Sequence, residues 1–135
     1  MKKKPFISIV VASYNRKYII NQTLSSLLKQ DYDQERFEII LVDNNSSDGT
    51  ITEVENKFKN EIKSSKLKLV ALKYNSGSSG SYSEALPHLN DAWAYMLKMD
   101  EDLVLDTKCL SNLVEEAEKS ESHGITGGKV YFYKE

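Results

Sequence analysis

The sequence predicts an α/β fold: a mostly parallel, Rossmann-like sheet flanked by helices. Apolar runs of strand length alternate along the chain with amphipathic segments of helical period. Strands that alternate with helices are joined by right-handed crossovers, which produce parallel sheets covered on both faces. The 135 residues have the length of one domain, and no internal repeat or long linker divides them.

The first half of the chain contains two strand–helix units. Residues 7–12 are apolar and largely β-branched, which predicts a buried strand, and apolar residues at helical spacing predict a helix over residues 17–29. Residues 37–42 predict the second strand. The apolar positions of the helix that follows continue for about three turns. Asp48 or Thr50 would cap this helix, since their oxygens can accept its first backbone N–H groups.

The second half continues the alternation. Residues 67–72 predict a third strand, followed by a short helix over residues 81–90 that its proline should kink. Residues 93–99 predict a fourth strand. An amphipathic helix then begins after Asp106, and residues 124–133 predict a last strand.

Composition limits the possible classes of function. Hydrophobic residues make up 40% and charged residues 28% of the chain, as in ordinary soluble domains. A net charge of −2 argues against a nucleic-acid partner. The single cysteine, Cys109, excludes an internal disulfide and fits a reducing compartment. No apolar stretch is long enough to span a membrane, so we expect a cytoplasmic location. The three lysines at positions 2–4 could contact an anionic membrane surface, so the inner face of the membrane is an alternative location.

Polar clusters follow the first two strands. Because open parallel sheets bind ligands at the carboxyl ends of their strands, both clusters should face one ligand. Tyr14 could offer its ring to a planar base, and Asp43 and Asn44 could bind a base edge or a ribose. Each also has a purely structural interpretation, because tyrosines are often half-buried and Asp and Asn often form turns.

A third cluster, Asp100-Glu101-Asp102, follows the fourth strand. In an extended segment Asp100 and Asp102 would point the same way, with Glu101 facing away. Two carboxylates with open positions between them suit Mg²⁺ or Mn²⁺, which substrate phosphates and water commonly complete. The alternative is a solvated acidic turn.

A glycine-rich segment, Gly-Ser-Ser-Gly at residues 77–80, lies between the third strand and its helix. Its glycines could let the backbone approach phosphate or sugar oxygens, or it could be a flexible connection. It matches neither the dinucleotide-binding nor the P-loop motif. Lys73 is a cation near this segment, or a surface lysine.

Together these segments resemble the family 2 inverting glycosyltransferases of the GT-A fold. The matching segments are residues 7–15, with Ala-Ser-Tyr-Asn, the Leu-Leu-Lys-Gln of residues 27–30, and residues 38–50. The order also matches, because an asparagine, a glycine-rich loop and an Asp-x-Asp sequence follow. The resemblance covers nearly the whole chain. The Asn44-Asn45 pair and residues 77–80 look closest to rhamnosyl- and galactofuranosyltransferase-like members.

The resemblance implies roles at both ends of a nucleotide-sugar donor. Ala12 and Tyr14 resemble the family's base contacts. Asp43 and Asn44 match a pair that is often two aspartates, so Asn44 departs from the pattern. An amide can still accept from a pyrimidine N–H and donate to a carbonyl.

At the diphosphate end, Asp100 resembles the acid that faces the ribose or the metal, and Asp102 resembles the ligand of Mg²⁺ or Mn²⁺. Lys73 and Asn75 complete the expected donor-binding residues.

The implied reaction is the metal-assisted transfer, with inversion, of a sugar from a UDP- or dTDP-sugar to a hydroxyl of a saccharide or lipid-linked acceptor. The family's acceptor-binding half and catalytic base lie downstream of the Asp-x-Asp strand. Residues 1–135 would therefore be a single donor-binding domain that is truncated before the acceptor half, lacks an assignable base and is inactive alone.

A non-catalytic sugar-nucleotide-binding or assembly module of the same fold stays open. A phosphoacceptor receiver domain using Asp43 would need further acids where this chain has Ser-Tyr-Asn at residues 13–15. A nucleotidyltransferase would carry a glycine- and arginine-rich loop after the first strand, and the chain has none.

Overall fold

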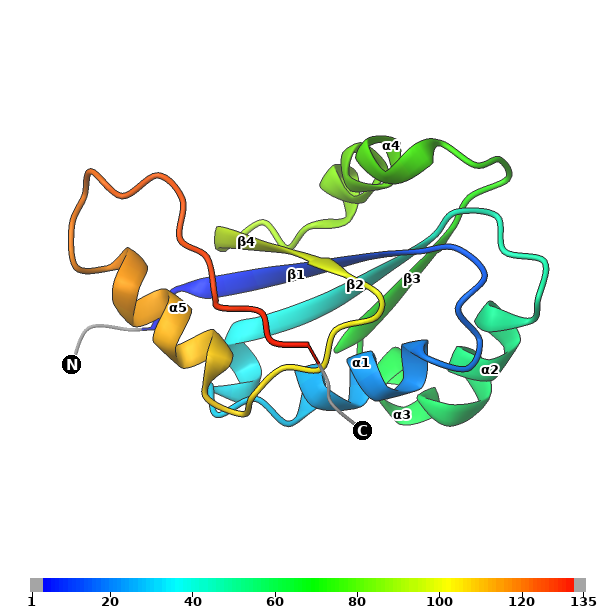
Figure 1. Ribbon diagram of the computed structural model, residues 1–135, viewed down its shortest axis with the longest axis horizontal. Coiled ribbons are helices and arrows are strands. Elements are labelled where there is room, and N and C mark those ends of the chain that lie inside the picture. Colours follow the sequence, from blue (N-terminus) through cyan, green and yellow to red (C-terminus); the bar gives the residue numbers. More distant parts are fainter. Residues whose placement is uncertain (1–3, 133–135) are drawn as a thin grey trace.

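The computed structural model describes residues 4–132 and contains a parallel sheet with helices on both faces (Figure 1). The strands are β1 (Phe6–Ser13), β2 (Phe37–Asp43), β3 (Leu67–Ala71) and β4 (Trp93–Asp100). The α-helices are α1 (Ile20–Leu28), α2 (Thr50–Lys57), α3 (Lys59–Lys63), α4 (Gly77–Ala85) and α5 (Cys109–Ala117). Two short 3-10 turns, Gln34–Arg36 and Leu86–His88, precede β2 and β4. The predicted fold class is confirmed.

The strand order is β3-β2-β1-β4, and every neighbouring pair is parallel. Every residue of β1 and β2 is buried, because helices cover both faces of these central strands. Successive side chains along each strand point to opposite faces of the sheet, so they contribute to two separate hydrophobic cores. One core lies under α1, α2 and α5, and the other lies under α4. Figure 1 shows α4 alone on its side of the sheet.

The strand register brings the carboxyl ends of the strands to one edge of the sheet. Ser13 pairs with Asp43, Asp43 pairs with Ala71, and Ala12 pairs with Asp100. The polar clusters that follow β1, β2 and β4 therefore start from neighbouring positions.

The helices differ from the predicted ones at their ends. The single helix expected after Thr50 is divided at Phe58, whose buried ring anchors the break between α2 and α3. α4 begins at Gly77, four residues before the predicted start, and Pro87 lies in the 3-10 turn that follows it. None of the helices in residues 4–132 combines the length and hydrophobicity needed to cross a bilayer.

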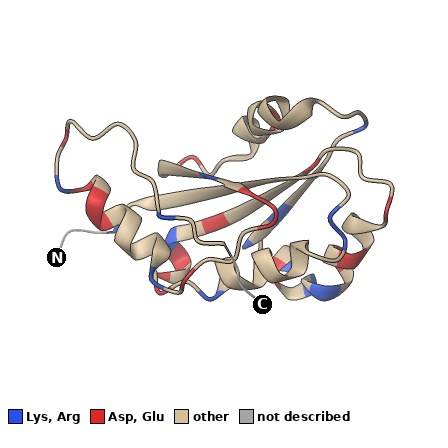
Figure 2. Ribbon diagram, in the orientation of Figure 1, with Lys and Arg blue, Asp and Glu red and all other residues tan. Residues whose placement is uncertain are grey.

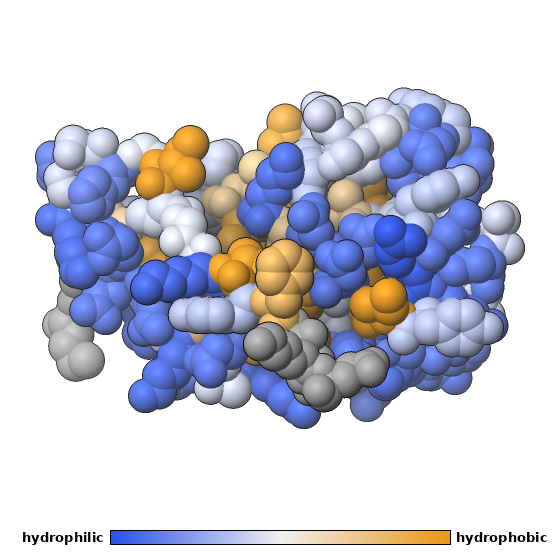
Figure 3. All heavy atoms as spheres, in the orientation of Figure 1, coloured by the Kyte–Doolittle hydropathy of each residue, from blue (hydrophilic) through white to orange (hydrophobic). Residues whose placement is uncertain are grey.

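The predicted last strand is wrong for residues 124–132, which are irregular; Tyr133 lies outside the described residues. β-branched and aromatic residues favour a strand only where a neighbouring strand supplies backbone partners. Here Ile125 is 95% exposed and Phe132 is fully exposed. Figure 3 shows such apolar groups scattered among hydrophilic ones. The outer edge of β4 pairs with no strand in the described part of the chain.

A buried ion pair joins the sheet to the chain that enters β4. Glu38 is 4% exposed, and its Oε2 lies 2.8 Å from the Lys68 ammonium. Its Oε1 accepts hydrogen bonds from the Ser8 hydroxyl and the Asn90 backbone N–H, each at 2.7 Å. Lys68 also donates to the His88 carbonyl at 2.8 Å. The carboxylate is fully partnered, so its role is structural.

We predict that Glu38→Ala lowers the free energy of unfolding by about 3 kcal/mol, because it leaves Lys68 and two donors without their acceptor. Urea denaturation measures the change. Glu55→Ala, at an exposed position of α2, is the control and should change stability by less than about 0.5 kcal/mol. Equal stability of the two variants would contradict the structural role of Glu38.

Candidate functional site

A pocket of about 190 Å³ opens at the carboxyl ends of the strands. Its lining comes from the ends of β1, β2 and β4 and from the start of α4: Ala12, Ser13, Tyr14, Asn44, Asn75, Gly77, Ser78, Ser81, Asp100 and Glu101. The structure thus brings together five of the predicted site residues, namely Ala12, Tyr14, Asn44, Asn75 and Asp100. Asp43, Lys73 and Asp102 are not part of this lining.

The β1 wall of the pocket combines a small residue with an aromatic one. Ala12 is 9% exposed and leaves room above the sheet, whereas Tyr14 is 44% exposed and offers its ring to a ligand. Between them, the buried Ser13 hydroxyl has no hydrogen-bond partner within residues 4–132. A planar group could stack on Tyr14 here.

Asp43 is 2% exposed and lies outside the pocket lining, next to the lining residue Asn44 and paired in the sheet with Ser13. Its Oδ2 accepts a hydrogen bond from the Ser46 backbone N–H at 2.9 Å. Its Oδ1 is buried and accepts none from the described residues. An unsatisfied buried acceptor costs about 1 to 3 kcal/mol.

Asn44 is held by the loop between β3 and α4. It is 5% exposed, and its Oδ1 accepts from the Ser76 backbone N–H at 2.7 Å and from the Ser76 hydroxyl at 3.1 Å. Its Nδ2 donates to Asn75 Oδ1 at 2.8 Å. The structure therefore places the Asn44 side chain at the pocket but commits it to protein partners.

Residues 77–80 are the first turn of α4, not a separate flexible loop. Gly77 has φ +73°, which favours glycine, and a Cβ on Gly80 would lie 2.6 Å from the Ser76 Cβ. The cap residue Ser76 makes no side-chain capping bond. The positive end of the α4 dipole thus faces the pocket, where it favours negative charge.

The acidic turn departs from the predicted alternation. β4 ends at Asp100, and Glu101 and Asp102 form a turn, so alternate residues no longer share a side. Glu101, predicted to face away, lines the pocket, and its Oε1 lies 3.2 Å from Arg16 Nε. Asp102 is exposed. Figure 2 shows acidic residues at this turn.

Arg16, which the sequence analysis did not single out, pairs with the lining residue Glu101 but is not itself part of the pocket lining. It follows the first polar cluster directly, and this position was the available signal. Lys73, the predicted cation, is exposed and lies outside the pocket lining. Within residues 4–132 no cluster of three or more His, Cys, Asp or Glu side chains is arranged to hold a metal.

Tyr82 of α4 supports the floor of the pocket. Its hydroxyl donates to the Met99 carbonyl at 3.0 Å. Burial, with the nearby charges of Asp100 and Glu101, raises the pKa of Tyr82 to about 12. The phenol therefore stays a neutral donor at physiological pH.

Many of the polar residues in the first two clusters join one loop to the other. The Asn15 backbone N–H donates to the Ser46 hydroxyl at 2.8 Å, and Asn15 Oδ1 accepts from the Ser47 N–H at 2.9 Å. The Lys17 N–H donates to Asp48 Oδ2 at 3.1 Å. The two clusters thus both line the pocket and fix its shape.

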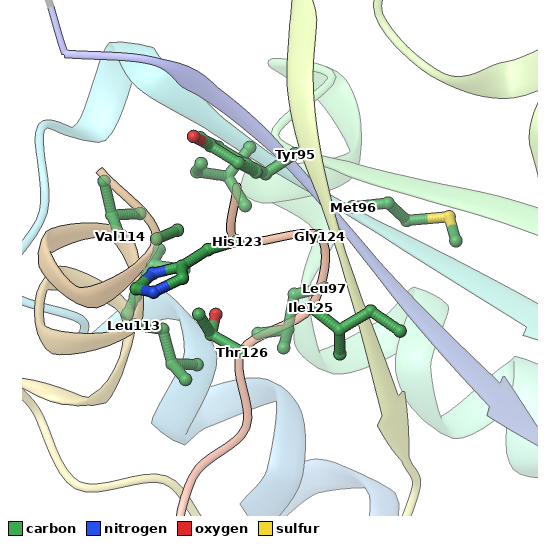
Figure 4. Close-up of a pocket in the computed structure, with 12 residues that line it drawn as sticks. Tyr95, Met96, Leu97, Leu113, Val114, His123, Gly124, Ile125 and Thr126 are labelled. Atoms are coloured by element: carbon green, nitrogen blue, oxygen red, sulfur yellow. The ribbon is translucent and has the colours of Figure 1, made fainter. Parts of the chain in front are cut away.

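A second cavity, of about 150 Å³, lies between β4, α5 and residues 123–126 (Figure 4). Its lining is mainly aliphatic and aromatic. The one imidazole there, His123, has its Nδ1 3.1 Å from the Glu116 carbonyl. This arrangement brings no reactive groups together, so the candidate site is the pocket at the strand ends.

Comparison with known proteins decides the family. The sequence model of glycosyl transferase family 2 matches residues 8–135. The chain belongs to this family. The Asp43, Tyr14 and Asp100 positions described above therefore lie in a glycosyl transferase family 2 domain.

Curated relatives of similar sequence are longer proteins. An uncharacterized glycosyltransferase of Haemophilus influenzae is 28% identical over 90% of this chain and 35% of its own length. The poly-beta-1,6-N-acetyl-D-glucosamine synthase of Staphylococcus epidermidis is 30% identical over 90% of this chain and 28% of its own length. The chain spans about a third of these relatives.

Solved structures agree on the fold. S. aureus TarS 1–349 has a TM-score of 0.73 and 29% identity over 84% of this chain and 32% of that one. The same protein in complex with UDP also has a TM-score of 0.73, with 26% identity over 90% of this chain and 38% of that one. The Pyrobaculum calidifontis mannosyltransferase PcManGT, in complex with GDP-Man and Mn²⁺, shares the fold, with a TM-score of 0.76 and 24% identity over 86% of this chain and 33% of that one. The GT-A fold is confirmed, and the rhamnosyl- and galactofuranosyltransferase-like branch stays a prediction.

We predict that Asp48→Ala lowers the free energy of unfolding at pH 7 by about 1 kcal/mol, because Lys17 and Thr50 lose an acceptor. Although burial opposes the shift, hydrogen bonds from Thr50 and the Lys17 N–H lower the pKa of Asp48 from its usual 3.8. A carboxylate with a lowered pKa stabilises the fold above its unfolded pKa and loses this effect as the pH falls through the folded pKa.

The stability difference between wild type and Asp48→Ala should therefore persist from pH 7 to about pH 4 and shrink below it. Urea denaturation at several pH values measures this difference. Asp31→Ala, at an exposed position, is the control. A difference that is constant between pH 2 and pH 7 would contradict the role of the ionised carboxylate.

Proposed function

We propose that the chain is the donor-binding part of a glycosyltransferase that uses a nucleoside-diphosphate sugar, with UDP- or dTDP-sugars as the expected donors. The observation that carries the proposal is one pocket at the strand ends that brings Tyr14, Asn44 and Asp100 together. Membership of the family and the likeness to a UDP complex support it.

The base would bind at the β1–β2 end of the pocket. Its ring would stack on Tyr14 above the small Ala12 side chain. Asp43 Oδ1, which is closed to solvent in the described structure, would have to become accessible to accept the imino N–H of uracil or thymine.

The diphosphate would lie between the acidic turn and the first turn of α4. Asp100 and Asp102 would hold Mg²⁺ or Mn²⁺, which requires the exposed Asp102 side chain to turn toward the pocket that Asp100 lines. Two hard oxygen ligands fit these ions, because water and substrate phosphates commonly complete their coordination. When bound, the ion would neutralise charge that develops on the departing diphosphate. The α4 dipole adds positive potential on the opposite wall.

The reaction would be the attack of an acceptor hydroxyl on the anomeric carbon, with inversion and departure of the nucleoside diphosphate. The residues of this chain would fix the donor in line for that attack. The acceptor would be a saccharide or a lipid-linked sugar, and the location would be the cytoplasm or the inner face of the membrane.

One observation favours the second candidate, a sugar-nucleotide-binding module without turnover. Within the described residues, Asp100 and Glu101 are the acidic residues that line the pocket, and Glu101 is paired with Arg16. Glu101 is engaged with Arg16 and Asp100 would hold the metal, so neither carboxylate is left to act as the general base that inversion needs. Release of nucleoside diphosphate in the presence of saccharide acceptors would distinguish an enzyme from such a module.

Calorimetry with UDP, dTDP, GDP and ADP, with and without Mn²⁺, tests the proposal. We expect UDP or dTDP to bind more tightly than the purine nucleotides, and binding to require the metal. Folded protein that binds none of the four with Mn²⁺ present would contradict the proposed function.

We predict that Asp102→Asn removes the Mn²⁺ dependence of nucleotide binding and leaves the fold intact, because an amide is a weaker ligand for a hard cation. Calorimetry measures binding, and circular dichroism checks the fold. Asp91→Asn, at an exposed position before β4, is the matched control. Unchanged affinity in Asp102→Asn would exclude Asp102 from the metal site.

A further inference from the structure

We propose that Asn44 is a positioning residue, whose carboxamide fixes Asn75 and the first turn of α4 as one wall of the pocket. The inference deepens the proposed function and rests on it for the identity of the ligand. The positioning itself follows from hydrogen bonds within the protein.

The orientation of both amides is set by backbone donors. The Ser76 backbone N–H points to Asn44 at 2.7 Å, and since a backbone N–H only donates, it must face Oδ1. The Gly77 N–H lies 2.9 Å from the Asn75 side chain, which must likewise face it with Oδ1. Asn44 therefore meets Asn75 Oδ1 with its Nδ2, at 2.8 Å.

This chain of hydrogen bonds connects the end of β2 to the start of α4. It fixes the backbone positions of Ser76, the residue before α4, and of Gly77, whose φ of +73° directs the chain into the helix. Ser76 also packs where a Cβ on Gly80 would clash. A change at Asn44 should therefore move the wall formed by Asn75, Gly77 and Ser78.

The same bonds exclude Asn44 as the acceptor for a base N–H. Both lone pairs of its Oδ1 are used by Ser76, through the backbone N–H and the hydroxyl. If residue 44 were an aspartate, one of its carboxylate oxygens would lie opposite Asn75 Oδ1, and two acceptors would repel each other. The position therefore requires an amide, whose NH₂ group can donate to Asn75 Oδ1.

Amide hydrogen exchange on the nucleotide-free protein tests the positioning directly. We expect Asn44→Ala to speed exchange of the Ser76 and Gly77 amides by about tenfold each, which corresponds to about 1.4 kcal/mol of lost protection. Asn44→Asp should speed exchange at Gly77 alone, because a carboxylate still accepts from Ser76 but repels Asn75 Oδ1. Asn60→Asp, at an exposed position of α3, is the matched control. Unchanged Ser76 exchange in Asn44→Ala would overturn the inference.

Binding of UDP and CDP with Mn²⁺ separates positioning from base recognition. If Asn44 acts through the wall, Asn44→Asp weakens both nucleotides by the same factor, about tenfold, and their affinity ratio is unchanged. Adding Asn75→Ala to Asn44→Ala should then cause no further loss, because both variants break one network. A changed UDP/CDP ratio, or an unchanged UDP affinity, would overturn the inference. Wild type that binds neither nucleotide, with the exchange pattern intact, would reject the proposed function and retain the positioning role.

Discussion

The parallel pairing of β1 with both β2 and β4 is the constraint on which the rest of the structure depends. Because β1 and β2 are buried on both faces, most of their side chains are apolar. Polar function is therefore confined to the last residues of the strands and the residues just after them. The register then sets how far apart those residues lie, since Ala12 is the partner of both Val42 and Asp100.

The loops at this edge are built as one unit. Asn15 and Asp48 tie the loop after β1 to the loop after β2, and Asn44 ties the loop after β2 to the start of α4. The Arg16–Glu101 pair adds the turn after β4. Each of the four segments around the pocket is thus bonded to another, so its geometry is set before any ligand arrives. Such preorganisation reduces the entropy that binding must overcome.

The sequence was sufficient for the fold and for the location of the site. Strand and helix periods, together with the clusters after residues 12, 42 and 99, placed Ala12, Tyr14 and Asp100 around one pocket. What it could not supply were the partners of individual side chains. The Asn44 amide could have faced a base or the protein, and only the position of the Ser76 N–H decides this. The predicted orientation of Glu101 was wrong because side chains alternate between the two faces only within a strand, and β4 ends at Asp100. The strand predicted at residues 124–133 failed in its described part because propensity does not provide a pairing partner.

The open side of β4 has a practical consequence. Its outer backbone groups pair with no strand in residues 4–132, and Trp93 and Met96 are 46% and 38% exposed. Such an edge is a template on which another polypeptide can add a strand. Exposed apolar side chains in residues 125–132 favour contact between one copy of the chain and another. At high concentration this chain will therefore be prone to intermolecular sheet growth, and its solubility will depend on what covers that border.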